Sequence, residues 1–181
     1  MALTFRTALT EDASTVAQLH AASWRRHYRG AYSDAYLDGD VLTDREQVWS
    51  ARLAAPAGTL TVLAEDEAGP AGFLHLVLDE DERWGSLVDN LHVRHGRQRT
   101  GVGGALVRRA AAAVAERARR QAMYLWVLEQ NHDAQRFYAA MGGTNVEKAL
   151  VEASGKAPGQ LVGTPGKLRI AWAEAGIAGL L

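Results

Sequence analysis

Cysteine is absent from the 181 residues. Its absence excludes disulfides, thiolate metal sites, iron–sulfur clusters and a cysteine nucleophile. Lysine is scarce, with only Lys148, Lys156 and Lys167, so arginine supplies most of the positive charge. No segment approaches the roughly 20 apolar residues of a membrane helix, and residues 1–6 lack the pattern of a signal peptide. We therefore expect a cytoplasmic protein without a membrane partner.

The chain also has no strong net charge of either sign, because 20 Lys and Arg are balanced by 21 Asp and Glu, which leaves a net charge of -1. Such a balance gives no general attraction to nucleic acid. Hydrophobic residues make up 48% and charged residues 23%, proportions typical of a packed globular protein. The length favours one domain over residues 1–181.

The hydrophobic pattern predicts seven strands, over residues 3–6, 59–65, 72–78, 86–93, 123–128, 146–151 and 168–172. It predicts four helices, over residues 10 to about 30, 43 to about 55, 103–120 and 132–141. A strand–helix–strand unit over residues 86–128 implies one parallel pair. The class is α+β: a mixed sheet of about seven strands with flanking helices.

Several boundaries depend on local signals. Thr10 is expected to cap the first helix, and the sequence Thr43–Glu46 is expected to open the second as a capping box. The acidic run at residues 79–82 is interpreted as a solvated loop, and residues 155–166 as a flexible Gly/Pro loop. The helix over residues 132–141 is expected to be the last one.

Residues 93–104 form a glycine-rich loop between a strand and a helix, an arrangement that suits an anion because backbone N–H groups and the helix dipole converge there. A nucleotide-triphosphate loop is excluded, because Val102 stands where lysine is required. A dinucleotide fingerprint fits poorly, because Gly101 and Gly103 lead to Leu106 rather than to Gly or Ala. The run Gln98–Gly103 matches a third pattern, Gln/Arg-x-x-Gly-x-Gly/Ala, completely.

With this loop, the chain resembles the GCN5-related N-acetyltransferase (GNAT) superfamily, in which the motif binds the pyrophosphate of acetyl-CoA. A second segment, Asn131–Gly142, is similar to the family's Asn-x-x-Ala-x-x-Phe/Tyr-Tyr-x-x-x-Gly pattern. The resemblance implies a GNAT-like fold and the transfer of an acetyl group from acetyl-CoA to a primary amine of a small molecule or peptide. Thr100 departs from the family's frequent Arg or Lys. A homodimer is a further expectation.

The resemblance also implies which residues bind the cofactor: His92, Val93, Gln98, Arg99, Thr100, Gly101, Val102, Gly103, Gly104, Asn131 and Tyr138. Asn131 and Tyr138 are seven positions apart and so lie on one face of a helix. The resemblance implies that Asn131 binds the pantetheine arm and that Tyr138 protonates the departing thiolate. A phenol suits this role because its pKa of ~10 keeps it protonated at neutral pH. The alternative is that Tyr138 is a core aromatic residue.

The sequence does not decide which residue accepts the proton of the amine. Without a thiol on the protein, we expect direct transfer in a ternary complex. Asp89 is the favoured base and is expected to share a strand face with Leu91 and Val93. Glu129 and a water relay are alternatives, whereas His92 is expected to face the other way.

Aromatic residues in the first helices are candidates for the acceptor pocket, namely Trp24, Tyr28 and Tyr32, with Tyr36 next in a spacing of four. Nearby carboxylates at Asp34, Asp38 and Asp40 would attract a cationic amine. The alternative is that the aromatic residues belong to the core and the carboxylates are solvated.

Two other functions compete. One is a GNAT-like module that binds acyl-CoA without turnover. The other is a nucleic-acid binder, because eight arginines lie between residues 94 and 120 against Glu116 alone. The six histidines show no His-x3-His spacing, so no metal site is expected. Gly-x-Ser-x-Gly is also absent, which argues against a serine hydrolase.

Overall fold

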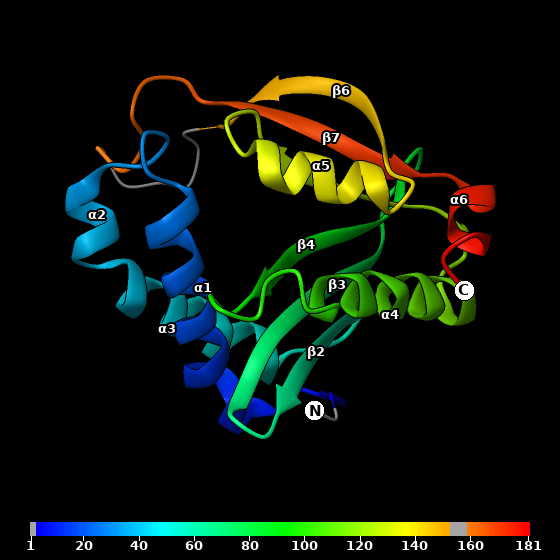
Figure 1. The fold of residues 1–181 in the computed structure, drawn as a ribbon, viewed down its shortest axis with the longest axis horizontal. Helices are drawn as coiled ribbons and strands as arrows, with labels where there is room; N and C mark the ends of the chain where they lie inside the picture. Colours follow the sequence, from blue (N-terminus) through cyan, green and yellow to red (C-terminus); the bar gives the residue numbers. More distant parts are fainter. Residues whose placement is uncertain (1–2, 153–158) are drawn as a thin grey trace.

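A seven-stranded mixed sheet with the order β1-β2-β3-β4-β5-β7-β6 organises the protein (Figure 1). The structure is a computed structural model that describes residues 3–152 and 159–181. The strands are β1 (Thr4–Thr7), β2 (Thr59–Asp66), β3 (Gly69–Asp81), β4 (Gly85–Val93), β5 (Met123–Leu128), β6 (Thr144–Leu150) and β7 (Gly166–Trp172). Among these seven strands, only β4 and β5 pair in parallel. The predicted α+β class and the parallel step are confirmed.

Helices cover both faces of this sheet. They are α1 (Ala13–His27), α2 (Asp34–Asp38), α3 (Val41–Ala54), α4 (Val102–Arg117), α5 (His132–Ala140) and α6 (Glu174–Ala178). Val16 of α1 and Trp49 of α3 pack with Phe73 of β3 on one face. Leu106 of α4 and Tyr138 of α5 pack with Leu74 on the other. The two faces therefore have separate cores.

The pairing of β4 with β5 is short, since Ser86 opposes Met123, Leu87 opposes Tyr124, and no further pair follows in the described chain. The register of β4 against β3 also shifts: His75 opposes Asn90 and Leu76 opposes Val88, which leaves Asp89 as the extra residue of a bulge. Beyond Leu87, the β5-facing edge of β4 is therefore open.

Two predicted helix starts are wrong. Thr10 lies in a short 3-10 turn and caps nothing; its hydroxyl donates to Glu11, while the Asp12 carboxylate accepts from the Leu9 N–H. Helix α3 begins at Val41 rather than Thr43. Val41 is fully buried, so tertiary packing extends the helix beyond the sequence signal.

The acidic run is also not a loop, because β3 continues to Asp81. The Asp79 carboxylate accepts hydrogen bonds from the backbone N–H groups of Arg119 and Arg120. Asp81 accepts from the N–H groups of Arg83 and Trp84 and so closes the turn into β4. These carboxylates satisfy backbone donors that a solvated loop would leave to water.

The C-terminal segment adds α6, which the sequence analysis did not predict. Its five residues are too few for a periodic signal, but Ile177 is buried in the larger core. Residues 155–158 of the predicted Gly/Pro loop lie outside the described residues. The rest of that loop is tied to residues 31–33, because Ser33 N–H donates to Gln160 and Val162 N–H donates to Ala31.

Candidate active site

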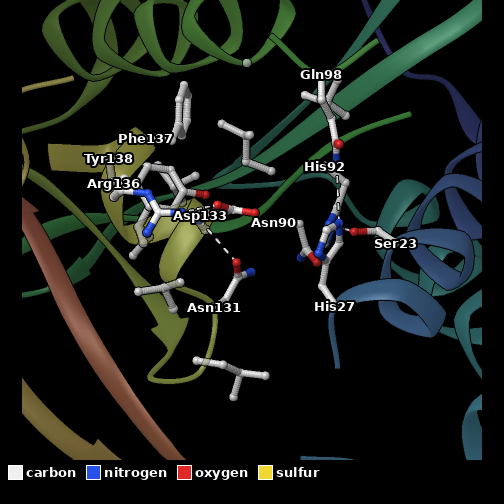
Figure 2. Close-up of a pocket in the computed structure, with 18 of the residues that line it drawn as sticks. Ser23, His27, Asn90, His92, Gln98, Asn131, Asp133, Arg136, Phe137 and Tyr138 are labelled. Carbon is white, nitrogen blue, oxygen red and sulfur yellow. Dashed lines mark hydrogen bonds and ion pairs between the residues drawn. The ribbon is translucent and has the colours of Figure 1, made fainter. Parts of the chain in front are cut away.

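A cleft of about 520 Å³ opens where β4 and β5 diverge (Figure 2). Its walls come from α1, β4, the glycine loop, the start of α4, β5 and α5. The lining residues are Ser23, His27, Tyr28, Val88, Asp89, Asn90, Leu91, His92, Val93, Gln98, Arg99, Gly101, Gly103, Gly104, Leu125, Trp126, Val127, Leu128, Asn131, Asp133, Ala134, Arg136, Phe137 and Tyr138. The two sequence motifs thus meet in one cavity.

The glycine loop turns sharply before α4. Gly96, Arg99 and Gly101 have positive φ values of 84°, 62° and 91°, and the Thr100 hydroxyl donates to the Arg97 carbonyl at 2.7 Å. The first N–H groups of α4 have no acceptor within the helix. Gly103 and Gly104 line the cleft, so the geometry suits an anion at the helix start.

Two predicted cofactor residues do not line the cleft with their side chains. Val102 is 3% exposed and packs in the core, where it approaches Gly72. Thr100 is exposed, and its hydroxyl braces the loop. The other nine predicted cofactor residues line the cleft.

Close packing explains glycine at position 103. A Cβ atom there would lie 3.1 Å from the Phe137 ring and 3.6 Å from the Val93 side chain. The start of α4 therefore approaches both α5 and β4 more closely than a larger residue permits. This approach brings the loop next to the second motif.

Helix α5 presents Asn131 and Tyr138 to the cleft (Figure 2). The Asn131 side-chain oxygen accepts from the Ala134 N–H at 3.2 Å and caps the helix. Its amide nitrogen donates to no other group within residues 3–152 and 159–181, so its two N–H donors could bind a ligand. Tyr138 is 7% exposed and packs edge-on against Trp172. Burial raises the pKa of Tyr138 above its usual value, so the phenol is a protonated donor at neutral pH.

The bulge in β4 overturns the predicted facing of Asp89. Leu91 and Val93 pack toward the core under α4, whereas the Asp89 carboxylate lies 2.6 Å from the Arg52 guanidinium of α3 and accepts from the Asn90 amide. An extra residue in a strand reverses the alternation of the side chains. Asp89 still lines the cleft, from the α3 side.

A group of histidines lies beneath the cleft wall formed by α1 and β4. His92 Nδ1 is 2.8 Å from the Ser23 hydroxyl, and its ring lies 4.7 Å from that of His20. His20 accepts from the Trp49 indole N–H at 3.0 Å. Burial lowers the pKa of His92 to about 3 and lowers that of His20 well below its usual range. Both rings are therefore neutral at physiological pH.

The predicted acceptor residues form one aromatic cluster. Trp24 stacks on Tyr28 with centroids 4.8 Å apart, and Tyr32 lies 4.9 Å from Trp24. Only Tyr28 of the three lines the cleft. Tyr32 and Tyr36 are 6% and 7% exposed and belong to the core, as the alternative interpretation expected.

The predicted acidic attraction is also weakened. Asp34 and Asp38 both form ion pairs with Arg29 outside the cleft lining. A cationic amine would compete there with an existing guanidinium.

The arginines after β4 meet more carboxylates than the sequence suggested. Asp66 of β2 lies 2.7 Å from Arg97 and 3.7 Å from Arg94, and Asp79 of β3 lies 3.3 Å from Arg119. Carboxylates distant in sequence thus neutralise part of the basic stripe.

Sequence reasoning assigned no role to several residues of the cleft. Ser23 and His27 come from α1, Trp126 from β5, and Asp133 and Arg136 from α5. Asp133 and Arg136 form an ion pair. For Ser23 and His27, the available signal was their position one residue before Trp24 and Tyr28 of the aromatic series. No sequence signal distinguishes Trp126, because β5 is apolar almost throughout.

Two negative findings apply to residues 3–152 and 159–181. No helix there has the length and hydropathy to cross a membrane. No group of three or more His, Cys, Asp or Glu residues there is placed to hold a metal ion.

Comparisons with known proteins identify the family of this chain. A model of the acetyltransferase (GNAT) family matches residues 18–142. The N-acetyltransferase YuaI of Bacillus subtilis, described as uncharacterized, is 28% identical over 156 residues, which cover 84% of this chain and 87% of YuaI.

Solved structures share the fold. The PaiA N-acetyltransferase of Thermoplasma acidophilum, solved with coenzyme A, has a TM-score of 0.71 at 18% identity and covers 95% of this chain and 100% of its own. YncA of Salmonella typhimurium, solved with acetyl-CoA, has a TM-score of 0.66 at 17% identity, with coverage of 96% and 95%. The family model spans more than half of the chain. The protein therefore belongs to the acetyltransferase (GNAT) family and is an acetyl-CoA-dependent N-acetyltransferase.

Proposed function

We propose that the cleft between β4 and β5 binds acetyl-CoA from the α4 side and a primary amine of a small molecule or peptide from the α3 side. The supporting observation is the continuity of the cavity. It runs from Gly103 and Gly104 at the start of α4, past Tyr138, to Asp89 and Tyr28. The donor and the acceptor would meet within the sheet, as direct transfer in a ternary complex requires.

The residues of the donor half suit coenzyme A. The amides between Gln98 and Gly104 would hold the diphosphate. The open edge of β4 near His92 and Val93 would pair with the amide groups of the pantetheine arm, and the Asn131 amide nitrogen would donate to the same arm. PaiA and YncA, which share the fold, were solved with coenzyme A and acetyl-CoA.

Transfer would proceed by attack of the amine nitrogen on the thioester carbon. A backbone N–H near Val93 would stabilise the oxyanion that forms. The C–N bond forms, the C–S bond breaks, and Tyr138 would donate its proton to the departing thiolate. The amine loses one proton, which Asp89 would accept directly or through water.

The role of Asp89 as base requires it to act beside Arg52. Its carboxylate lies 2.6 Å from the Arg52 guanidinium, and its oxygens have lone pairs that could also accept a hydrogen bond from the amine. Tyr28 lines the same end of the cleft and would contact the acceptor, with Trp24 and Tyr32 supporting it. A homodimer, a cytoplasmic location and a single domain remain predictions.

Calorimetry with coenzyme A, followed by a thiol-release assay with acetyl-CoA and a panel of amines, tests the proposal. We expect binding to one site and thiol release with at least one amine. Binding without release from any amine would favour the non-catalytic acyl-CoA module. Failure to bind coenzyme A would overturn the proposed site.

A further inference from the structure

Trp126 is one of the residues that line the cleft, and two cations lie against its indole ring. The Lys167 ammonium is 4.4 Å from the ring centroid and the Arg169 guanidinium carbon is 4.5 Å away. Trp126 opposes Arg169 in the pairing of β5 with β7, and Lys167 is two residues before Arg169. All three side chains therefore project from the same face of the sheet.

The two cations differ in their partners. Arg169 is 12% exposed and forms ion pairs with Asp81 at 3.3 Å and Glu147 at 2.8 Å. Lys167 has no carboxylate within 4.0 Å among the residues that the structure describes, and its contact is the Trp126 ring. A cation–π contact leaves the positive charge of an ammonium uncompensated. Lys167 is thus the charge in this group that lacks a counter-ion.

The carboxylate at the same end of the cleft is already engaged. Asp89 projects toward α3, and Arg52 lies 2.6 Å from it. Tyr28, Asp89 and Trp126 line the cleft, and the Lys167 ammonium lies against the Trp126 ring without being a lining residue itself. A purely cationic polyamine would place further positive charge next to Lys167, which is unfavourable.

We infer that the acceptor is a primary amine that also carries a carboxylate or another anionic group, and that Lys167 binds this group beside Trp126. The inference rests on the proposed function, since the amine must reach the acetyl group next to Asp89. Lys167 would be a specificity-determining residue, because its ammonium would reach past the Trp126 ring to the acceptor but not to the reacting atoms.

The strand spacing sets how far apart the two groups of the acceptor lie. Two strand spacings, about 10 Å in a regular sheet, separate β4 from β7, and the divergence of β4 from β5 beyond Leu87 makes the distance at the cleft larger. The Lys167 side chain covers part of this distance toward Trp126. The anionic group is therefore expected several bonds from the amine rather than on the adjacent carbon.

A homologous series of amines tests this inference. Glycine, 4-aminobutanoate and 6-aminohexanoate are each compared with the corresponding amide in the thiol-release assay. We expect kcat/KM for the carboxylate to exceed that for the amide by about tenfold at the preferred length, a ratio that one ion pair can supply, and glycine to be the poorest of the three acids.

Substitutions assign the preference to one side chain. Lys167→Met keeps the aliphatic contact with Trp126 and should reduce the acid-to-amide ratio to about 1, with the effect mainly on KM. Lys167→Arg retains the charge and should retain the preference. Lys148→Met is the matched control, because Lys148 is paired with Glu129 and is 60% exposed; it should leave the ratio unchanged.

The outcomes separate the two proposals. Thiol release from acids and amides at equal rates, or an unchanged ratio in Lys167→Met, would overturn the role of Lys167 and leave the acetyltransferase site intact. Absence of thiol release with every amine in a wider panel would overturn the proposed function together with this inference.

Discussion

At the scale of single residues, Tyr138 is the side chain on which turnover is expected to depend most. Its phenol is buried in the cleft, and burial keeps it protonated. Tyr138→Phe removes only the hydroxyl and should slow thiol release by at least ~10²-fold, the usual contribution of a general acid. Calorimetry should show unchanged affinity for coenzyme A.

A second tyrosine serves as a control, because its replacement by phenylalanine also removes a buried hydroxyl group but does so outside the cleft. Tyr124 is 5% exposed and is not part of the cleft lining. Tyr124→Phe should therefore retain the wild-type rate of thiol release. Equal losses in both variants would show that the effect of Tyr138→Phe is structural.

Buried histidines should make stability depend on pH. Burial lowers the pKa of His75 to about 4 and that of His92 to about 3. Because the unfolded chain binds protons near pH 6.5 and the folded chain does not, stability is complete above this pH and is lost as the pH falls toward 4. At pH 5 the loss should be up to roughly 2 kcal/mol for each histidine.

Urea denaturation at pH 7.5, 6 and 5 measures this slope. His75 Nδ1 is 2.8 Å from the Thr61 hydroxyl, and His75→Gln offers a side chain that does not titrate. The variant should show a shallower decline below pH 6.5. A free energy of unfolding that does not change between pH 7.5 and 5 would contradict the expectation.

At the scale of elements, the turn into α4 depends on glycine at one position. Gly101 has φ +91°, and a Cβ atom there would meet no heavy atom within 4 Å. The cost of Gly101→Ala is therefore backbone strain alone, about 1–2 kcal/mol. In urea denaturation, this strain should appear as a lower midpoint concentration, while the dependence of the unfolding free energy on urea concentration stays unchanged.

Gly104, three residues later, provides a comparison, because alanine at this position should change stability in the opposite direction. It lies within α4, where a Cβ atom would meet its nearest neighbours at 3.6 Å, an ordinary contact. Gly104→Ala should raise the stability of the free protein by about 0.5–1 kcal/mol. If both variants shift stability in the same direction, the left-handed conformation is not what requires glycine at position 101.

At the scale of the whole molecule, coenzyme A should stabilise the folded state by joining the two halves of the sheet across the cleft. A ligand at 100 times its dissociation constant adds about 2.7 kcal/mol. For a chain of this size the thermal midpoint should rise by roughly 5–10 °C. Acetylpantetheine, which lacks the diphosphate, should give a smaller shift at the same concentration. An equal shift would show that the loop amides do not hold the diphosphate.

The sequence alone determined the elements in which local pattern and structure agree. The strand at β5 has the predicted bounds, Met123–Leu128, because an apolar segment of that length between turns has few alternatives. The loop Gln98–Gly104 and the segment from Asn131 identified the family, since the spacing of glycines and polar residues is a local property. The boundaries of α3 and β3 were missed, because burial of Val41 and capping by Asp79 depend on distant partners.

Only the tertiary structure decided which side chains meet. The bulge at Asp89 turned its carboxylate toward Arg52, 37 residues away, and the sheet order set Lys167 and Arg169 against Trp126. A one-residue irregularity reverses the facing of a strand, and neighbours across a sheet have no fixed separation in sequence. The residues of the proposed donor half could therefore be predicted from motifs, whereas the proposed acceptor half arises from contacts between distant strands and helices.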